Sequence, residues 1–202
     1  MNTRWRVGIA GAGSIALGTA ALLAQHGHHP MLWSPSGKGT EGLESGVSSN
    51  GAIKLFFEPC IANSAKKLVA ENQILILALP AWGHKEVMDD LAPHISQGQQ
   101  AIVSSHASMG ALYLMQLLKA RGVSVPITAW GTTAVTGRRE EGPVVRVNTV
   151  RSRIDLCTIP EDMSKSAMSV CQQLFDDRFE PRAGLLAISL SNLNPQNHLG
   201  IA

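Results

Sequence analysis

The chain has 202 residues, which is enough for one sizeable domain, or for one domain and part of another. Hydrophobic residues make up 45% of it and charged residues only 16%, so a large buried core is expected and disorder is not. The net charge is +2 and no run of lysine or arginine occurs, which argues against a nucleic-acid partner.

Cysteine usage and hydropathy bear on the compartment. The three cysteines are scattered without a C-x-x-C spacing, which is typical of reduced thiols in a cytosolic protein. No basic and then apolar leader opens the sequence, and its apolar stretches are too short and interrupted to cross a membrane. We therefore expect a cytoplasmic protein without a membrane partner.

A glycine-rich turn near the N-terminus is the first motif. Residues 7–10 read as a short buried strand, and an apolar helix is expected to begin at Ser14. The pattern G-x-G-x-x-A covers the turn and the first residues of the helix, and is formed by Gly11, Ala12, Gly13, Ser14, Ile15 and Ala16. The first glycine permits the turn, the second lets the backbone approach a pyrophosphate, and the small alanine lets helix and strand pack closely. The alternative is an ordinary strand–helix turn, but the flanking elements favour a dinucleotide site.

The end of the second expected strand, residues 30–33, predicts the choice of cofactor. NAD-selective sites usually place a carboxylate there, about twenty residues after the glycines, to bind the ribose 2′-hydroxyl. This chain has Ser34 instead, followed by Lys38. A hydroxyl and a lysine would accept a 2′-phosphate, which favours NADP, although NAD stays possible and the lysine could simply be solvated. The nearby histidines 26, 28 and 29 are expected at a solvated helix end, not at a metal site.

The middle of the chain alternates between strands and helices. Residues 39–51 are expected to be a loop, followed by a short strand over 53–57 and a helix that Asn63 or Ser64 caps. Further strands are expected over 74–79, 101–105 and 126–130, with a helix over 107–121. Leu79 and Pro80 lie at the carboxyl end of the first of these strands, where such sheets bind ligands, so we expect them to contact the cofactor.

Consecutive strands then replace the alternation. They are expected over 132–135, 144–150 and 154–159, with a charged turn over 138–143, and predict an antiparallel addition at the sheet edge. A helix follows, in which Cys171 belongs to an apolar stripe and serves packing. The predicted fold class is therefore α/β: a Rossmann-like, doubly wound and mostly parallel sheet with an antiparallel edge extension.

Residues 183–193 are expected to form an apolar helix with leucines 186, 190 and 193 on one face. Ser191, Asn194 and His198 form an approximate polar line across it, because Pro195 interrupts regular helix there. A frayed and solvated C-terminus is the simple interpretation. Buried Asn and His side chains would instead need hydrogen-bond partners.

Two motifs, one at each end, carry a resemblance to a known family. The fingerprint at residues 11–16 is shared by many dehydrogenases, whereas N-x-N-P-x-x-H, from Asn192 to His198, is more specific. Together they make the chain similar to the N-terminal part of the octopine/nopaline (opine) dehydrogenase family. The resemblance implies NAD(P)H-dependent reductive joining of an amino acid to a 2-oxo acid. It implies that His198 is the catalytic acid/base, and that Asn192 and Asn194 position the loop or the substrate.

The resemblance also implies a division into domains. Residues 1–182 would form the cofactor-binding domain, and residues 183–202 would start the linking helix into a second, helical domain that is absent from this chain. The chain alone is then expected to bind cofactor without turnover, and to pair through its leucine face with a second copy or with a separate C-terminal domain chain. Two alternatives stay open: a ketopantoate-reductase-like or glycerol-3-phosphate-dehydrogenase-like enzyme, which usually has a lysine in place of His198, and a non-catalytic NADP(H)-binding protein.

Overall fold

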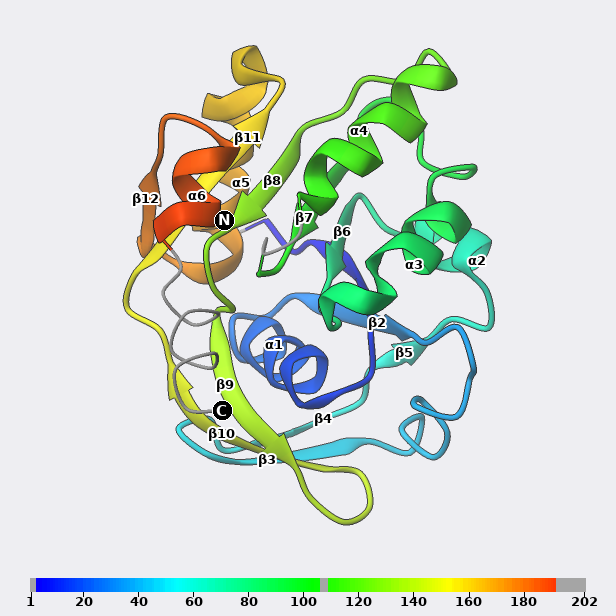
Figure 1. The fold of residues 1–202 in the computed structure, drawn as a ribbon. Helices are drawn as coiled ribbons and strands as arrows, with labels where there is room; N and C mark the ends of the chain where they lie inside the picture. The colour runs from blue at the N-terminus through cyan, green and yellow to red at the C-terminus, as the bar shows by residue number, and fades with distance from the viewer. Residues whose placement is uncertain (1–2, 106–108, 192–202) are drawn as a thin grey trace, which may run out of the picture.

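The computed structural model describes residues 3–105 and 109–191 and contains two β-sheets with helices packed on them (Figure 1). The large sheet has the strand order β12-β11-β8-β7-β6-β1-β2-β5. Its strands are β1 (Arg6–Ala10), β2 (His29–Trp33), β5 (Cys60–Ile61), β6 (Ile74–Leu77), β7 (Gln100–Val103), β8 (Ile127–Trp130), β11 (Ile154–Ile159) and β12 (Phe179–Pro181). The α-helices are α1 (Ser14–Gln25), α2 (Ala65–Glu71), α3 (His84–Leu91), α4 (Gly110–Ala120), α5 (Ser164–Phe175) and α6 (Leu185–Ser191), with short 3₁₀ turns η1 (Ala81–Gly83) and η2 (Glu161–Met163).

The large sheet is doubly wound around β1. The chain runs from β1 to β2 and β5 in one direction, then returns to the other side of β1 for β6, β7 and β8, all in parallel register. The order therefore reverses between β1 and β6, where open α/β sheets place ligands beyond the carboxyl ends of the strands. The central strands are continuously buried, as expected of a parallel sheet covered on both faces.

The antiparallel extension is present at β11, which pairs with β8 in the register Leu156↔Trp130 to Ile159↔Ile127. The predicted α/β class, with a mostly parallel Rossmann-like sheet, is thus confirmed. The two strands that precede β11 do not join this edge. They belong to the small sheet, because their partners lie near residue 50 and not at β8.

The small sheet has the order β4-β3-β10-β9 and packs against α1 (Figure 1). Its strands are β3 (Val47–Gly51), β4 (Leu55–Phe57), β9 (Val135–Arg139) and β10 (Val144–Val150). Two predictions were wrong here. Residues 47–51 form a strand although a loop was expected, and β9 begins three residues later than the predicted strand and includes two residues of the predicted charged turn. The sequence of β3 is polar, so pairing with β4 and β10, and not its own pattern, makes it a strand.

Helix α1 matches the predicted start and is buried along Ala16–Leu23, because the large sheet covers one side and the small sheet the other. A helix that is apolar all round needs such a double cover. One cluster of buried side chains surrounds α1 and α5, and another lies beneath α2, α3 and α4. Gly27, with φ +81°, ends α1 as expected.

The prediction of a solvated histidine cluster after α1 was wrong for His28, which is buried. Its Nδ1 accepts a hydrogen bond from the Trp5 amide at 3.3 Å, and its Nε2 lies 3.0 Å from the Gln173 carbonyl oxygen. These partners require a neutral ring that donates from Nε2. Burial lowers the pKa of His28, helped by the charges of His26 and His29. Among the described residues, no group of three histidine, cysteine or acidic side chains is arranged to hold a metal ion.

The C-terminal part of the described chain packs on β8 and β11. Cys171 on α5 is fully buried, which raises the pKa of its thiol to about 12 and fits the predicted packing role. Helix α6 buries Leu185 and Ile188, while Leu186 and Leu190 are 65% and 74% exposed. No helix within the described ranges is both long and apolar enough to span a bilayer.

Candidate functional site

Gly11 directly follows β1, at the point where the strand order of the large sheet reverses between β1 and β6. Its φ is +133°, and a Cβ added to it would lie 2.3 Å from the carbonyl oxygen of Ala78, directly after β6. Its amide donates to the Trp33 carbonyl oxygen at 2.8 Å. Both the backbone angle and the close approach exclude a side chain, so this glycine shapes the turn.

Gly13 faces open space. It is the N-cap residue of α1, no side chain caps the helix there, and the first turn contains no acidic residue. A Cβ added to Gly13 would meet no atom within 4 Å. Amide groups at a helix start need acceptors and favour negative charge, so the space above Gly13 fits a pyrophosphate.

A cavity of about 340 Å³ lies beside this turn. It is lined by Gly13, Ser14 and Ile15 from the turn and α1, by residues 78–81 after β6, by Ser104 and Ser105 after β7, and by Thr133. The predicted residues Leu79 and Pro80 therefore lie beside the glycine turn, because the parallel strands β1, β6 and β7 all end at the same edge of the sheet.

The cavity wall holds a polar atom that has no partner among the described residues. The Oγ atom of Ser104 is buried and makes no hydrogen bond to any described residue. The next residue, Ser105, has φ +69°, a conformation that is uncommon for residues other than glycine. A buried hydroxyl costs free energy unless it is hydrogen-bonded, so this atom is available to a polar ligand group. Thr133 was not singled out from the sequence, because it follows β8 much later in the chain.

His84 supports the wall formed by Leu79. Its Nε2 lies 3.2 Å from the Leu79 carbonyl oxygen, and burial lowers the pKa of its ring. The ring is then neutral near pH 7 and can donate from Nε2 to the carbonyl. His84 thereby fixes the turn that connects β6 to α3.

The loop after β2 folds against the glycine turn. A Cβ added to Gly39 would lie 2.9 Å from the Ala12 Cβ and 3.1 Å from the Ser34 Oγ, so the two loops touch there. Ser34 thus lies where the sequence predicts a ribose-binding residue, and Lys38 is exposed in the same loop. Arg139 also reaches this point: its Nη1 donates to the Ala12 and Gly39 carbonyl oxygens at 2.9 and 2.8 Å.

Sequence reasoning missed Arg139. It treated the residue as part of a charged turn, and no local signal connects it with residues 100 and 127 positions earlier. The register of β9 with β10 and the packing of the small sheet on α1 bring it to the glycine turn. The predicted residues Asn192, Asn194 and His198 lie outside the described residues.

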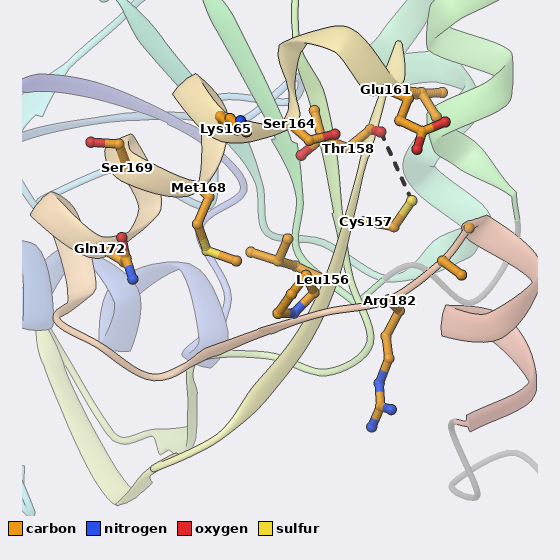
Figure 2. A pocket seen from close by; sticks show the side chains of 14 residues that line it. Leu156, Cys157, Thr158, Glu161, Ser164, Lys165, Met168, Ser169, Gln172 and Arg182 are labelled. Atoms are coloured by element: carbon orange, nitrogen blue, oxygen red, sulfur yellow. Dashed lines mark hydrogen bonds between the residues drawn. The ribbon is translucent and has the colours of Figure 1, made fainter.

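A second cavity, of about 530 Å³, lies between β11, α5 and residues 181–184 (Figure 2). It shares no lining residue with the first one. Burial and the Glu161 carboxylate raise the pKa of the Cys157 thiol, which lines this cavity and contacts the Thr158 carbonyl oxygen at 3.9 Å. The thiol is therefore neutral and a poor nucleophile. Arg182 is paired with Asp155 at 2.9 Å and is not available there as an unpaired cation.

The reversed strand order, the glycine turn and the open helix start define a Rossmann-like nucleotide-binding domain. A family model described as ketopantoate reductase PanE/ApbA matches residues 7–154. The chain belongs to this family.

The chain is also similar to opine dehydrogenases. It is 25% identical to the opine dehydrogenase of Arthrobacter sp. (strain 1C) over 131 residues, which are 64% of this chain and 36% of that protein. The structure of octopine dehydrogenase with NADH and L-arginine matches with a TM-score of 0.75 and 16% identity, covering 93% of this chain and 51% of that one. Yersinopine dehydrogenase with NADP⁺ matches with a TM-score of 0.73 and 19% identity, covering 96% and 51%.

These comparisons confirm the resemblance that the two motifs indicate. The chain spans about half the length of either solved structure, and the curated relative is matched over about a third of its length. The similar structures hold NADH or NADP⁺, in agreement with the predicted nicotinamide dinucleotide. The choice between the two stays a prediction.

Proposed function

We propose that this chain is the cofactor-binding domain of an NAD(P)H-dependent oxidoreductase of the opine dehydrogenase type, which joins an amino acid reductively to a 2-oxo acid. One observation carries the proposal. The space above Gly13 is open, while the buried Ser104 Oγ at the adjacent wall has no partner among the described residues. The bound cofactor would supply a hydride, and the residues around it would bind and orient it.

Each part of the site has a distinct role in this proposal. The amides at the start of α1 bind the pyrophosphate, because they lack a side-chain cap. Leu79 and Pro80 form an apolar wall that excludes water from the cofactor. The Ser104 hydroxyl donates to, or accepts from, a polar group of the cofactor or the substrate.

The acid/base chemistry is proposed from the sequence motif alone. His198 would exchange the proton that accompanies reduction, since an imidazole can both accept and release a proton near neutral pH. Asn192 and Asn194 would position that segment or the substrate. The Ser34 hydroxyl and the Lys38 ammonium favour NADP(H) over NAD(H), because neither repels a 2′-phosphate.

The other enzyme candidates keep support from the family match. A ketopantoate-reductase-like or glycerol-3-phosphate-dehydrogenase-like reaction would use the same cofactor site. A non-catalytic NADP(H)-binding protein would bind cofactor without turnover. Assays of the intact protein with pyruvate and mixed amino acids, with ketopantoate and with glycerol 3-phosphate distinguish these candidates.

The outer face of α6 supports a partner that covers it. Leu186 and Leu190 lie one turn apart and are both largely exposed, whereas Leu185 and Ile188 face the core. We propose that residues 1–182 form the cofactor-binding domain and that residues 183–202 lead toward a helical second domain. The leucine face would pack on that domain, on a second copy of this chain or on a separate C-terminal domain chain.

The cofactor site can be tested with two matched glycine variants. Gly13 and Gly184 each directly precede a helix, and the carbonyl oxygen of each accepts a hydrogen bond from a backbone amide of that helix. Both have open space at the position of an added Cβ. In Gly13→Val, the branched side chain fills the pyrophosphate position, so NADPH should bind at least about tenfold more weakly, or about 1.4 kcal/mol. Gly184 lines the second cavity, so Gly184→Val should keep the wild-type affinity for NADPH.

The readout is a fluorescence titration with NADPH and with NADH, and the wild type should prefer NADPH. Unchanged affinity in folded Gly13→Val would remove the cofactor from the glycine turn. A loss confined to Gly184→Val would move it to the second cavity.

A further inference from the structure

Arg139 lies against two loops of the cofactor site that are far from it in the chain. It ends β9 in the small sheet, yet its guanidinium reaches Ala12, between the two glycines of the turn, and Gly39, in the loop after β2. Both hydrogen bonds run to backbone carbonyl oxygens and both start from Nη1. The guanidinium therefore holds the two loops at a fixed separation.

Within the described residues, the remaining donors of Arg139 have no partner. An arginine has five N–H donors, and Nη1 provides two of them. The other three, on Nη2 and Nε, have no hydrogen-bond or carboxylate partner in the part of the chain that the structure describes, and the residue is exposed. The adjacent Glu140 does not neutralise it by contact, since its carboxylate accepts from the Asn50 amide at 3.0 Å.

The contacts of Nη1 bring the guanidinium next to the expected position of the adenosine ribose. In this fold the residue after the second strand meets the ribose 2′-oxygen. That residue is Ser34, whose Oγ would lie 3.1 Å from a Cβ on Gly39, the residue whose carbonyl oxygen binds Arg139. The pyrophosphate position, above Gly13, is one residue from the other carbonyl. The guanidinium thus lies at the junction of the turn and the ribose-binding loop.

The start of the loop after β2 carries a basic side chain, and the first acidic residue of that loop is Glu41. Residues 34–40 contain Lys38 and no acidic side chain, and the first turn of α1 has none either. A guanidinium offers parallel N–H donors that match two oxygens of one phosphate, which a lysine ammonium cannot do. An anion with several oxygens therefore fits this point better than a hydroxyl does.

We propose that Arg139 binds the 2′-phosphate of NADP(H) and is a specificity-determining residue of the cofactor site. The inference rests on the proposed function, and adds a residue that the small sheet contributes to a site otherwise built by the large one. Arg139 selects NADPH over NADH because only the phosphorylated ribose carries an anionic group with several oxygens, which accepts charge-assisted hydrogen bonds from its free donors. Its two carbonyl contacts hold the guanidinium in place before the cofactor arrives.

Arg139→Gln and Arg138→Gln form a matched pair for the test. Both remove one positive charge from an exposed position of the same strand, but only Arg139 contacts the glycine turn. Arg139→Gln should weaken NADPH binding by about tenfold or more and NADH binding by less than about threefold, because only one of the cofactors loses a charge-assisted bond. Arg138→Gln should leave the ratio of the two affinities unchanged. Arg139→Lys should fall between Arg139→Gln and the wild type.

The titrations distinguish a failure of this proposal from a failure of the proposed function on which it rests. If the wild type binds neither cofactor, the proposed function fails. If it binds NADPH and Arg139→Gln weakens both cofactors equally, Arg139 only holds the loops together and this inference is wrong while the site stands. A wild type that prefers NADH, or an unchanged ratio in Arg139→Gln, overturns the inference in the same way.

Discussion

The two sheets differ in how their strands are stabilised and in what they contribute to the site. The large sheet is apolar and buried along its central strands, and its strand ends form the glycine turn and the cavity. The small sheet mixes polar and apolar residues, with a polar β3 and with alternating buried and exposed positions in β10. It contacts the site through the end of β9, by way of one guanidinium.

The two sheets therefore contribute different properties to the site: the large sheet determines its shape, and the small sheet adds a positive charge. The large sheet fixes where a dinucleotide can lie, because its backbone sets the turn and the helix start. The small sheet covers α1 and brings Arg139 to the glycine turn and to the loop after β2. In the proposed site, the small sheet would therefore change the cofactor preference without altering the turn itself.

The largest expected effect comes from the turn of the large sheet. Gly11→Ala forces a side chain into φ +133° and to within 2.3 Å of the Ala78 carbonyl oxygen, so it should lower the free energy of unfolding by more than about 2 kcal/mol. Gly142, in the hairpin of the small sheet, has φ +71° but open space at the Cβ position. Gly142→Ala should cost only about 1 kcal/mol.

Urea denaturation of both variants measures this difference. Equal losses would mean that the contact with Ala78 contributes nothing beyond the backbone angle.

A smaller effect is expected where the small sheet meets α1. A Cβ on Gly18 would lie 2.9 Å from Val135 Cγ2 and 3.5 Å from Val147 Cγ2, so Gly18→Leu should displace β9 and cost about 1–3 kcal/mol. The shift also carries Arg139 away from the turn, so the preference for NADPH should fall. Adding Val135→Ala should restore part of both properties.

Thermal unfolding and the two cofactor titrations measure this coupling. A stable Gly18→Leu variant with wild-type cofactor preference would show that the small sheet does not position Arg139.

The smallest expected effect is a pH dependence of stability, which arises from histidines beside the large sheet. His28 and His84 pack beside the large sheet and burial lowers the pKa of each, whereas the four strands of the small sheet contain no histidine. Below the ordinary value of 6.5 the unfolded chain binds protons that the folded chain does not. Stability should therefore be complete above that pH and fall as the pH drops, by at most about 1.4 kcal/mol per pH unit for each histidine.

His28→Gln keeps a donor and an acceptor in place and should reduce this slope. His29→Gln, which removes an exposed imidazole from the same segment, is the control. Chemical denaturation between pH 7 and pH 5 measures the slope, and an equal reduction in both variants would contradict a specific role of His28.

The sequence by itself determined the central architecture. The glycine pattern, the apolar strands and the start of α1 were predicted correctly because their signals are local: a turn that needs glycine, and runs of apolar residues as long as one strand or one helix. For the same reason Leu79 and Pro80 were placed at the site, since strand ends of a parallel sheet meet at one edge. The apolar stripe around Cys171 also predicted its burial.

Tertiary structure alone decided the rest. The residues of β3 carry no apolar pattern, and they become a strand because β10 and β4 supply hydrogen-bonding partners. His28 follows a helix like a solvated residue, but α5 buries it through the Gln173 carbonyl. Arg139 gains its position only when the small sheet packs on α1. Each of these contacts joins distant parts of the chain, and the periodicity of neighbouring residues contains no record of which distant surface will meet them.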